Sequence, residues 1–325
     1  MIVVDADVLG RRRTGEETYV LNLLRQLPVV APDLRFAAVT RKPELVPDGV
    51  EAVSLPARSQ ELRMAWSLPR LLRRLRPELG HFQHAVPLGW RGRTVVTLHD
   101  LHFERDPGVM GFVDRLTFKT VVPRAARRAD HVLAVSERTR DDAIELYGLS
   151  PDALTVTPHG VDPAFGPGDD APGGFLLFVG AIQARKDPLA AVAAAHEAGL
   201  PLVAAGPEKE PALARRLREA GVDVRGWVDR PELARLYRQA AALVLPSRYE
   251  GFGLPVLEAM ASGTPVVVSE DPALRAVAGD AAAPTVQAAL EQRDVWRQKG
   301  LERAKLFSWE ETARRTAAVY RQVLA

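Results

Sequence analysis

The sequence predicts an α/β protein built from two doubly wound domains that face each other across a cleft. Short apolar segments alternate with longer segments of helical periodicity along the whole chain, which is typical of parallel sheets covered by helices. The length of 325 residues exceeds what one hydrophobic core usually organises. One stretch, Phe165–Gly174, holds four glycines and two prolines and therefore has the composition of a linker.

The first half of the chain predicts a sheet with helices between its strands. Apolar runs place strands near Ile2–Val4, Phe36–Val39, Val95–Leu98, His131–Ala134 and Leu154–Val156. Helical patterns lie near Glu17–Gln26, Gln60–Arg74, Phe112–Arg127 and Glu137–Leu146. We therefore expect a first domain over residues 1–168, ending within the linker.

The second half repeats the alternation. Strands are expected near Phe175–Val179, Leu202–Ala205, Leu243–Leu245 and Val266–Val268, and helices near Pro188–Ala198, Pro211–Glu219, Pro231–Ala240 and Pro255–Ala261. A last helix over 309–325 begins after Ser308, with Glu311 placed for a capping box. We expect a second domain over residues 169–308. Ligands of such folds bind beyond the carboxyl ends of the strands, so the loops there are where a site is expected.

The composition excludes several classes of protein. The sequence has no cysteine, which excludes disulfides, thiolate metal sites and a cysteine nucleophile. The formal net charge is +2 and the pI about 9.0, too small a surplus to indicate a nucleic-acid partner. Met1 leads directly into the first predicted strand, and no apolar run reaches the ~20 residues of a membrane span. These observations favour a soluble, cytoplasmic enzyme.

The stretch Ala242–Ser269 combines two buried strands with a glycine loop and a helix. Pro255 suits the first position of that helix, and Gly263 suits a left-handed position after its end. Glu250 lies in the loop and Glu258 in the helix, so both carboxylates can face the cleft and accept hydrogen bonds from a hydroxyl-rich ligand. Singly, each acid would be unremarkable; beside a basic loop they indicate a binding site.

That basic loop follows the strand Phe175–Val179 and runs from Gly180 to the adjacent cations Arg185 and Lys186. Asp187 is a good N-cap and the proline after it a good first helical residue, so the cations lie just outside a helix N-terminus. Such a position is already electropositive and suits a diphosphate.

In the first half, the strand Val95–Leu98 ends in His99 and Asp100, which places an imidazole and a carboxylate at the cleft. Together they suit hydrogen bonding to a hydroxyl or acid–base chemistry. Gly15 lies at a helix start, where N–H groups can face an anion, although an ordinary glycine turn fits the sequence equally well.

Two other polar pairs are weaker signals. Asp5 and Asp7 mimic a metal-binding D-x-D motif, but spaced carboxylates are common by chance and we expect no metal there. His81 and His84 suggest a metal pair without a third ligand, so structural or substrate-edge roles are expected.

These motifs, in this order, resemble the retaining glycosyltransferases of family 4. EGFGLPVLE matches the E-x7-E motif of that family, and FVGAIQARKDP resembles its phosphate loop. Five further segments are similar to family motifs: TGEETYVLNLL to the N-terminal glycine motif, VVTLHDL to the strand ending in His-Asp, AVSERTRDDAIELYGL and VTPHGVDPAF to the segments before the hinge, and FSWEETA to the start of the C-terminal helix. The resemblance covers nearly the whole chain and is closest to a bacterial mannosyltransferase-like branch. It implies the GT-B fold of two Rossmann-like domains, with the last helix crossing back onto the first domain.

The resemblance also implies roles for single residues. Arg185 and Lys186 would bind the donor diphosphate, with Gly180 and Gly15 against it, and Glu258 would bind the ribose hydroxyls. The donor sugar would contact Glu250, Phe252, Gly253 and Leu254. Asp100 belongs to the donor-binding set, and His99 would hydrogen-bond the sugar near its anomeric carbon. The implied catalytic set is His99, Glu250, Lys186 and Arg185.

The implied reaction is retaining transfer of a hexose, without a metal or other cofactor, from a nucleotide-diphosphate sugar to a glycan, a lipid-linked or a small-molecule acceptor. Mannose from GDP-mannose is the expected donor, and a UDP-sugar or other nucleotide sugar is the alternative. A nucleotide-dependent oxidoreductase would need a G-x-G-x-x-G after the first strand, which residues 10–15 lack. A non-enzymatic two-domain nucleotide- or sugar-binding protein is a remote alternative that the cationic loop disfavours.

The acceptor side offers one signal, the amphipathic stretch Gln60–Arg76. Counted from Arg58, it has six arginines against one acid. Its apolar residues are expected to face the core: Leu62, Trp66, Leu68, Leu72 and Leu75. The alternative is a helix that lies on an anionic membrane, which would suit a lipid-linked acceptor and a peripheral location at the inner membrane face.

Overall fold

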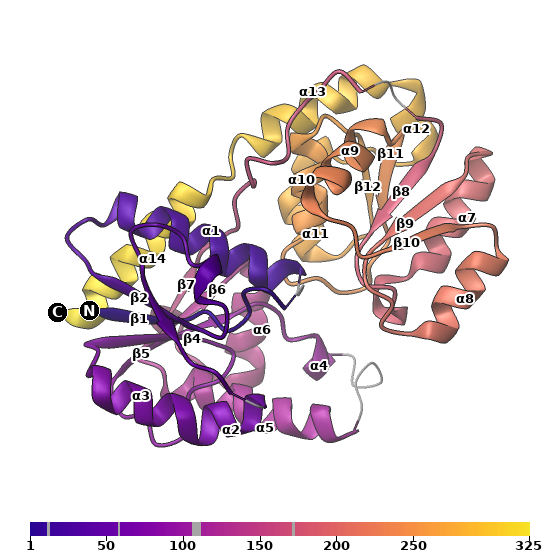
Figure 1. Ribbon diagram of the computed structural model, residues 1–325. Coiled ribbons are helices and arrows are strands. Elements are labelled where there is room, and N and C mark those ends of the chain that lie inside the picture. The colour runs from indigo at the N-terminus through magenta and orange to yellow at the C-terminus, as the bar shows by residue number, and fades with distance from the viewer. Residues whose placement is uncertain (12–13, 58, 106–111, 171–172) are drawn as a thin grey trace. The chain divides into compact units, whose positions relative to one another are not determined.

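A computed structural model describes residues 1–11, 14–57, 59–105, 112–170 and 173–325. The chain forms two compact units, one of Met1–Gly160 with Ser308–Ala325 and one of Val161–Phe307 (Figure 1). Each unit has its own parallel sheet with helices on both faces, as predicted for two doubly wound α/β domains. The division falls at residues 160–161, ahead of the linker.

The first unit contains a seven-stranded sheet in the order β3-β2-β1-β4-β5-β6-β7. Its strands are β1 (Ile2–Asp5), β2 (Phe36–Thr40), β3 (Glu51–Ser54), β4 (Leu79–Gln83), β5 (Arg93–Leu98), β6 (His131–Ala134) and β7 (Leu154–Val156). The strand order reverses between β1 and β4. Loops that follow these two strands therefore diverge, which opens the usual ligand position of such a sheet.

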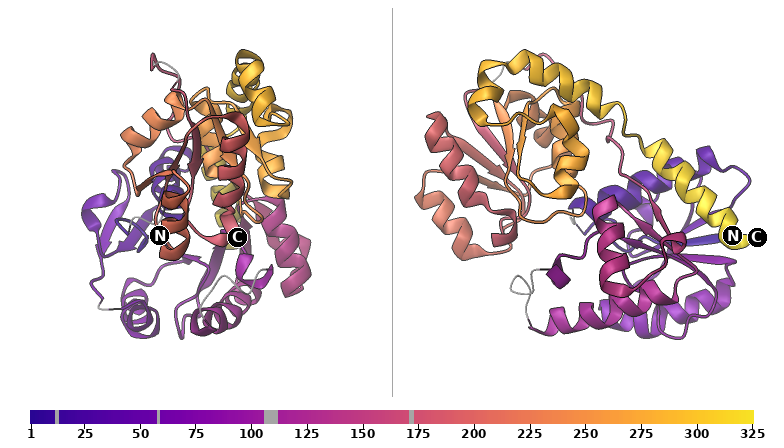
Figure 2. Two further views of the ribbon diagram at one scale, coloured as in Figure 1. Left: turned by 90° about the vertical axis from the view of Figure 1, so that its right-hand side faces the viewer. Right: turned by 180° about the vertical axis from the view of Figure 1, so that it is seen from behind.

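Helices cover both faces of this sheet (Figures 1 and 2). One face carries α1 (Thr14–Val30) and α14 (Trp309–Leu324); the other carries α3 (Leu68–Leu75), α5 (Phe112–Arg128) and α6 (Glu137–Tyr147). The connections contain short turns: η1 (Pro43–Leu45), α4 (His102–Arg105) and η4 (Pro151–Ala153). Apolar clusters beneath α3 and beneath α5 and α6 bury the strand side chains and fix the edge at which the loops emerge.

The second unit has a five-stranded sheet in the order β10-β9-β8-β11-β12. Its strands are β8 (Leu176–Val179), β9 (Leu202–Ala205), β10 (Asp223–Gly226), β11 (Ala242–Leu245) and β12 (Val266–Val268). Its helices are η5 (Ala184–Lys186), α7 (Pro188–Ala198), α8 (Pro211–Glu219), α9 (Arg230–Gln239), α10 (Leu254–Ala261), α11 (Pro272–Ala278), η6 (Gly279–Ala281), α12 (Val286–Glu291) and α13 (Arg293–Ala304). In Figure 1, α7 and α8 lie on one face of the sheet and α9 and α10 on the other.

Three strands were not predicted, and each lacks a continuous apolar run. β3 and β10 are the outer strands of their sheets, and most of their residues are exposed or half-buried. β4 is central and buried, but Gly80 and His81 interrupt its apolar residues. Edge strands, and central strands interrupted by polar residues, are therefore missed when strands are predicted from apolar runs.

The predicted helix caps form. The Ser308 side chain accepts a hydrogen bond from the Glu311 N–H at 3.1 Å, and Asp187 accepts one from the third residue of α7 at 3.4 Å. The helix α10 begins at Leu254, so Pro255 is its second residue rather than its first. Proline is tolerated there because the first-turn N–H groups have no partner inside the helix.

The chain passes between the units twice, at neighbouring points. It leaves the first unit after Gly160 and re-enters at Ser308. A Cβ atom on Gly160 would lie 2.0 Å from the backbone nitrogen of Trp309, an approach that only glycine allows. On the other side, the Val161 N–H donates to the Phe307 carbonyl at 3.4 Å. The two crossing segments therefore run side by side.

The described part of the glycine-rich segment Phe165–Gly174 packs on the second unit. The Phe165 ring is buried, and it meets Tyr237 edge-on with 5.7 Å between the ring centroids. Asp170 forms an ion pair with Arg238 of α9. This segment is tied down by side chains in spite of its linker composition.

The predicted helix Gln60–Arg74 is a continuous run of α2 (Gln60–Leu62), the π-helical η2 (Arg63–Ser67) and α3. The expectation that its apolar side chains face the core is correct for Leu68 and Leu72. It is wrong for Leu62 and Trp66, which are 56% and 62% exposed. A π-helical turn holds more residues than an α-helical turn, so Leu62 before it and Trp66 within it do not continue the apolar stripe of α3.

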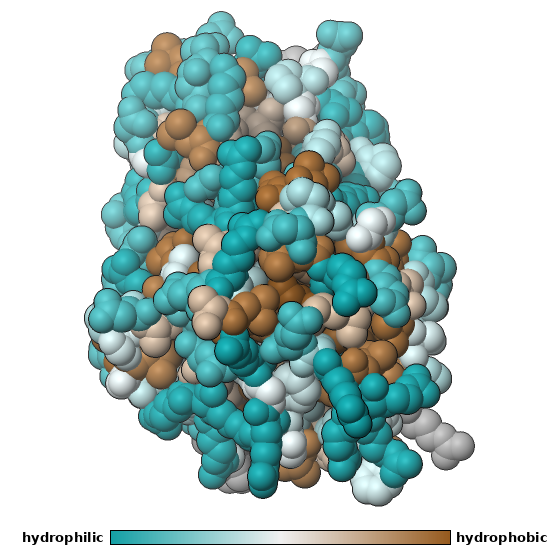
Figure 3. Space-filling view, turned by 90° about the vertical axis from the view of Figure 1, so that its left-hand side faces the viewer, coloured by the Kyte–Doolittle hydropathy of each residue, from teal (hydrophilic) through white to brown (hydrophobic). Residues whose placement is uncertain are grey.

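The surface mixes charged and apolar residues. On the face that Figure 3 shows, hydrophobic residues gather across the middle, among hydrophilic ones. Within the described part of the chain, no helix combines the length and the apolar character that crossing a bilayer requires.

Candidate functional site

The loops after β8 and β11 bring the two predicted cations and Glu250 together. Lys186, in the turn η5, forms an ion pair with the Glu250 carboxylate. The Arg185 Nη1 lies 3.7 Å from the other carboxylate oxygen and donates to the carbonyl of Tyr249. The two loops are far apart in sequence and meet because β8 and β11 are adjacent parallel strands. The sequence-predicted juxtaposition is therefore present.

This cluster holds two cations against one carboxylate in a nearly closed environment. The side chains of Arg185, Lys186 and Glu250 are 7%, 11% and 8% exposed. Burial alone would raise the pKa of Glu250, but the charges of Lys186 and Arg185 outweigh it and lower the pKa below its ordinary value. The Nε of Arg185 is buried and has no hydrogen-bond partner among the described residues. The cluster therefore keeps a surplus positive charge and one unused donor.

Glycines let the backbone of this edge pack closely. Gly180 directly follows β8 and has a φ of +152°, outside the range that other residues favour. A Cβ atom on Gly206, after β9, would lie 2.0 Å from the carbonyl oxygen of Gly180. Gly206 was not singled out from the sequence, where it reads as an ordinary turn glycine.

The loop Glu250–Gly253 is held from the next loop of the sheet. The Glu250 N–H donates to Asp271 Oδ2 at 3.2 Å, while Asp271 Oδ1 accepts from the first turn of α11 at 3.0 and 3.1 Å. Gly253 has a φ of +111°, and a Cβ atom there would lie 2.8 Å from the Leu274 side chain. Sequence reasoning missed Asp271, although an aspartate before a proline is a recognisable N-cap.

Phe252 and Leu254 complete this loop. Phe252 is buried and packs edge-on against Phe307, with 6.0 Å between the rings, while Leu254 opens α10. Beside the loop, a shallow pocket of about 340 Å³ is lined by Pro246, Ser247, Arg248, Ser269, Glu270, Asp271 and Pro272.

Glu258 lies one turn into α10 in a different environment. Its carboxyl group is buried and accepts a hydrogen bond from the hydroxyl of Tyr237 at 2.8 Å. Burial raises the pKa of Glu258 to about 8, and the charge of Asp162 adds to the rise. Near neutral pH the carboxyl group is therefore mostly protonated. Neither residue was predicted to belong to the site, although Asp162 lies within the segment VTPHGVDPAF.

In the first unit, His99 lies at the carboxyl end of β5, as predicted. Its Nε2 is 2.8 Å from Gln83 Oε1 at the end of β4, and the Tyr19 ring meets it edge-on at 4.9 Å. Burial, with a smaller contribution from neighbouring His84, lowers the pKa of His99 to about 4. The imidazole is therefore neutral at physiological pH. Gln83 was not anticipated and carries a buried Nε2 with no partner among the described residues.

The neighbours of His99 form further polar pairs. Asp100, at the end of the same strand, accepts a hydrogen bond from His102 Nδ1 on its Oδ1 atom at 2.6 Å. Gly15 is the second residue of α1, and Glu16 beside it lies 3.4 Å from His84. The structure places Gly15 at a helix start, as expected.

His81 is a structural residue. It is fully buried, with Nδ1 at 2.6 Å from the Tyr320 hydroxyl and Nε2 at 2.7 Å from Thr97 Oγ1. It thereby connects β4, β5 and α14.

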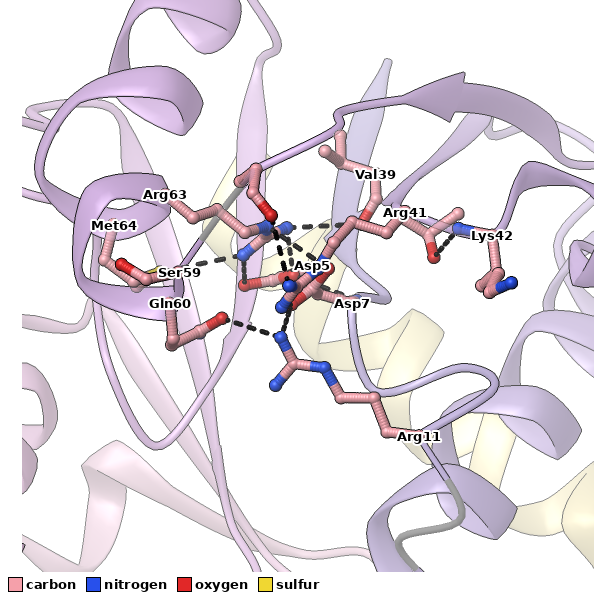
Figure 4. A network of polar contacts seen from close by, with 12 residues as sticks. Asp5, Asp7, Arg11, Val39, Arg41, Lys42, Ser59, Gln60, Arg63 and Met64 are labelled. Carbon is pink, nitrogen blue, oxygen red and sulfur yellow. Dashed lines mark hydrogen bonds and ion pairs between the residues drawn. The ribbon is translucent and has the colours of Figure 1, made fainter.

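Asp5 and Asp7 are surrounded by guanidinium groups (Figure 4). Asp5 is paired with Arg63, and Asp7 with Arg41 and Arg11. Both carboxylates are thus used as acceptors for arginine. No group of three or more histidine and acidic side chains suited to a metal ion is found in the described ranges.

Comparison with known proteins covers both units. Residues 13–165 match the family model described as Glycosyltransferase Family 4, and residues 174–294 match the model described as Glycosyl transferases group 1. The O-antigen chain mannosyltransferase B of Escherichia coli is 30% identical in an alignment 268 positions long that covers 70% of this chain and 70% of that one.

Two further similarities agree with this assignment. A D-inositol 3-phosphate glycosyltransferase of Frankia alni is 34% identical over 241 residues. That alignment covers 60% of this chain and 59% of the relative. Sucrose-phosphate synthase of Thermosynechococcus elongatus has a similar fold, with a TM-score of 0.73, 20% identity and coverage of 99% of this chain and 98% of that one. Two parallel-sheet domains, family models over both and a mannosyltransferase aligned over most of the chain lead to one conclusion: the protein is a glycosyltransferase of family 4 with the GT-B fold.

Proposed function

We propose that this enzyme transfers a hexose from a nucleotide-diphosphate sugar with retention of configuration and without a metal ion. The observation that carries the proposal is the cluster of Arg185, Lys186 and Glu250 at the carboxyl edge of the second sheet. Its surplus positive charge and unused Arg185 Nε–H suit a diphosphate, whose charge grows as the bond to the sugar breaks.

The second unit supplies the remaining contacts to the donor. The first turn of α10, from Leu254, presents backbone N–H groups toward the edge where the sugar would bind. Glu258 is assigned to the ribose hydroxyls, and the hydroxyl of Tyr237 holds it in place. A protonated carboxyl group both donates and accepts, so it can pair with a hydroxyl without bringing a buried charge to the nucleotide.

Retention follows from attack on the face that the diphosphate leaves. The acceptor oxygen bonds to the anomeric carbon, the bond from that carbon to the diphosphate breaks, and the acceptor proton passes to a diphosphate oxygen. Glu250 is a poor nucleophile for the alternative double displacement, because both its oxygens are engaged by cations. His99 contributes a neutral imidazole that hydrogen-bonds the transferred sugar, and Gln83 holds the ring by accepting from its Nε2–H.

GDP-mannose is the first donor to test, with UDP-sugars as the alternative. The support is the relative named a mannosyltransferase at 30% identity. The acceptor is a glycan, a lipid-linked or a small molecule.

A lipid-linked acceptor would place the enzyme at the inner face of a membrane. The exposed residues Leu62 and Trp66, with Arg70 5.1 Å above the Trp66 ring, form an apolar and cationic surface suited to anionic lipid. We define these three residues as the Trp66 surface.

A binding and turnover screen tests the donor assignment. GDP and UDP are compared by thermal shift, and GDP-mannose and UDP-sugars by release of nucleoside diphosphate and by the anomeric configuration of the product, with and without EDTA. We expect stabilisation by one of the two nucleotides, retention, and no effect of EDTA.

Variants then test the cluster. Lys186→Met should lower turnover by about 100-fold, the usual cost of losing one electrostatic contact to a developing anion. Glu250→Gln should also lower turnover, because the carboxylate that pairs with Lys186 and Arg185 is lost and the two cations are no longer held in place. Lys305→Met removes an equal charge at the end of α13 and serves as the control. Full activity in both cluster variants would refute the assignment.

A further inference from the structure

The carboxyl edge of the first sheet carries a second cationic cluster, and its charges do not balance. It contains Arg63, Arg41 and Arg11 against two carboxylates, those of Asp5 and Asp7 (Figure 4). These residues follow or face the ends of β1 and β2, the side of a parallel sheet where ligands bind. The surplus is one positive charge.

Two of the arginines are committed to the fold. Arg63 is completely buried and bonds both oxygens of Asp5, at 2.9 and 2.6 Å, as well as the Val39 carbonyl at 3.3 Å. Arg41 donates hydrogen bonds to both oxygens of Asp7, from Nε at 2.9 Å and from Nη2 at 2.7 Å. Its Nη1 donates to the Ala57 carbonyl at 3.3 Å. Asp5 and Asp7 are each neutralised by one bidentate arginine.

Arg11 is the cation left over. Its Nη2 contacts the already paired Asp7 and also Gln60 Oε1 at 3.1 Å. Its Nε and Nη1 have no partner among the described residues, and its side chain is 25% exposed. Three guanidinium groups therefore crowd one carboxylate at Asp7, with Arg63 Nε 3.5 Å away as the third. The Arg11 guanidinium group exceeds the charge of the two carboxylates, and its two unused nitrogens are exposed enough to bind an anion from outside.

We infer that Arg11, supported by Gln60 and Asp7, binds an anionic group of the acceptor, a phosphate or a carboxylate. The inference rests on the proposed function, because it assigns the acceptor to the first unit and the donor to the second. The inference restricts the acceptor to hydroxyl compounds that also carry a negatively charged group.

The test compares acceptors in matched pairs that differ only in charge: mannose with mannose 6-phosphate, and glucose with glucuronate. Transfer is measured with the donor selected by the screen, and binding of each compound is measured separately by calorimetry without donor. The variants are Arg11→Gln, the charge-preserving Arg11→Lys, and Arg124→Gln as a control on the exposed side of α5.

The wild-type enzyme should prefer the charged member of at least one pair by about tenfold, the effect of one charge-assisted contact. Arg11→Gln should remove that preference while changing use of the neutral member less than about twofold, Arg11→Lys should restore part of it, and Arg124→Gln should keep all of it. The pair that responds identifies the anion as phosphate or carboxylate.

Two results would overturn the inference: equal use and equal binding of both members of each pair, or an unchanged preference in Arg11→Gln. Failure of the proposed function is a different outcome. In that case no nucleotide sugar is turned over, yet calorimetry still shows charged compounds binding to the wild type and losing about tenfold in Arg11→Gln.

Discussion

Glu258 shows how strongly one residue can depend on its surroundings. In the unfolded chain its carboxyl group would lose its proton near its ordinary pKa of 4.5, whereas burial keeps the folded pKa at about 8. Between these values the unfolded state releases a proton that the folded state retains. The free energy of unfolding therefore falls as pH rises through this window, because Glu258 favours the folded state only while it is protonated.

Replacing Glu258 by glutamine should therefore stabilise the protein at alkaline pH. Glutamine keeps the acceptor for Tyr237 and never ionises, so the gain should be small near pH 4.5 and reach on the order of 4 kcal/mol at pH 8. Urea unfolding at several pH values measures it, with Glu197→Gln on α7 as an exposed control. A gain that does not grow with pH would show that Glu258 is ionised in the folded protein. Nucleotide affinity should fall in the same variant if Glu258 binds the ribose.

At the level of single residues, the sequence reveals the parts of the site that lie in one continuous motif. Glu250, Glu258, Arg185 and Lys186 are recognisable because glycines and helix starts surround them. Their partners come from other elements: Tyr237 reaches Glu258 from α9, and Asp271 reaches the Glu250 backbone from the loop before α11. No local spacing marks these contacts, since they exist only after the sheet has assembled.

At the level of elements, apolar runs predict the buried central strands well and the polar ones poorly. The segment Gln60–Leu75 shows a second limit. Its helix was predictable from periodicity, but the π-helical turn η2 was not. At this turn Arg63 points inward to Asp5. Leu62 and Trp66 face outward, so they do not belong to the apolar stripe that α3 buries. The change of helical phase at η2 therefore coincides with a buried ion pair formed across 58 residues of sequence.

The Trp66 surface gives a prediction for this element. Trp66→Ala should weaken co-sedimentation with vesicles that contain anionic phosphatidylglycerol by roughly tenfold, because the indole is lost as a lipid contact and Arg70 loses the ring that positions it. Trp227→Ala, which removes an exposed tryptophan from the second unit, is the matched control and should bind as the wild type does. Equal binding by Trp66→Ala, or no wild-type binding, would show that the surface does not serve a membrane.

At the level of the whole molecule, the chain begins and ends in the same unit. The helix α14 returns from the second unit and packs along α1, and Tyr320 inserts against His81, 239 residues away in sequence. Tyr19 and Thr97 extend the contact, with 3.0 Å between their hydroxyl oxygens. The first unit is therefore complete only when the second has been built, and the resemblance to family 4 implied this when it assigned the last helix to the first domain.

This buried network should make the first unit sensitive to acid. Burial lowers the pKa of His81 to about 3 and that of His99 to about 4, whereas both would titrate near 6.5 in the unfolded chain. As pH falls below 6.5 the unfolded state takes up protons that the folded state cannot, so the free energy of unfolding falls by about 2 kcal/mol per histidine by pH 5. The variant His81→Leu is less stable at pH 7, because Tyr320 and Thr97 lose a partner, but it should lose about 2 kcal/mol less than the wild type between pH 7 and pH 5. Urea unfolding at both pH values measures the difference, and His196→Gln, on the exposed side of α7, should match the wild type. If His81→Leu loses as much stability as the wild type over this interval, His81 takes up its proton in the folded state, and the network does not set the acid limit of the fold.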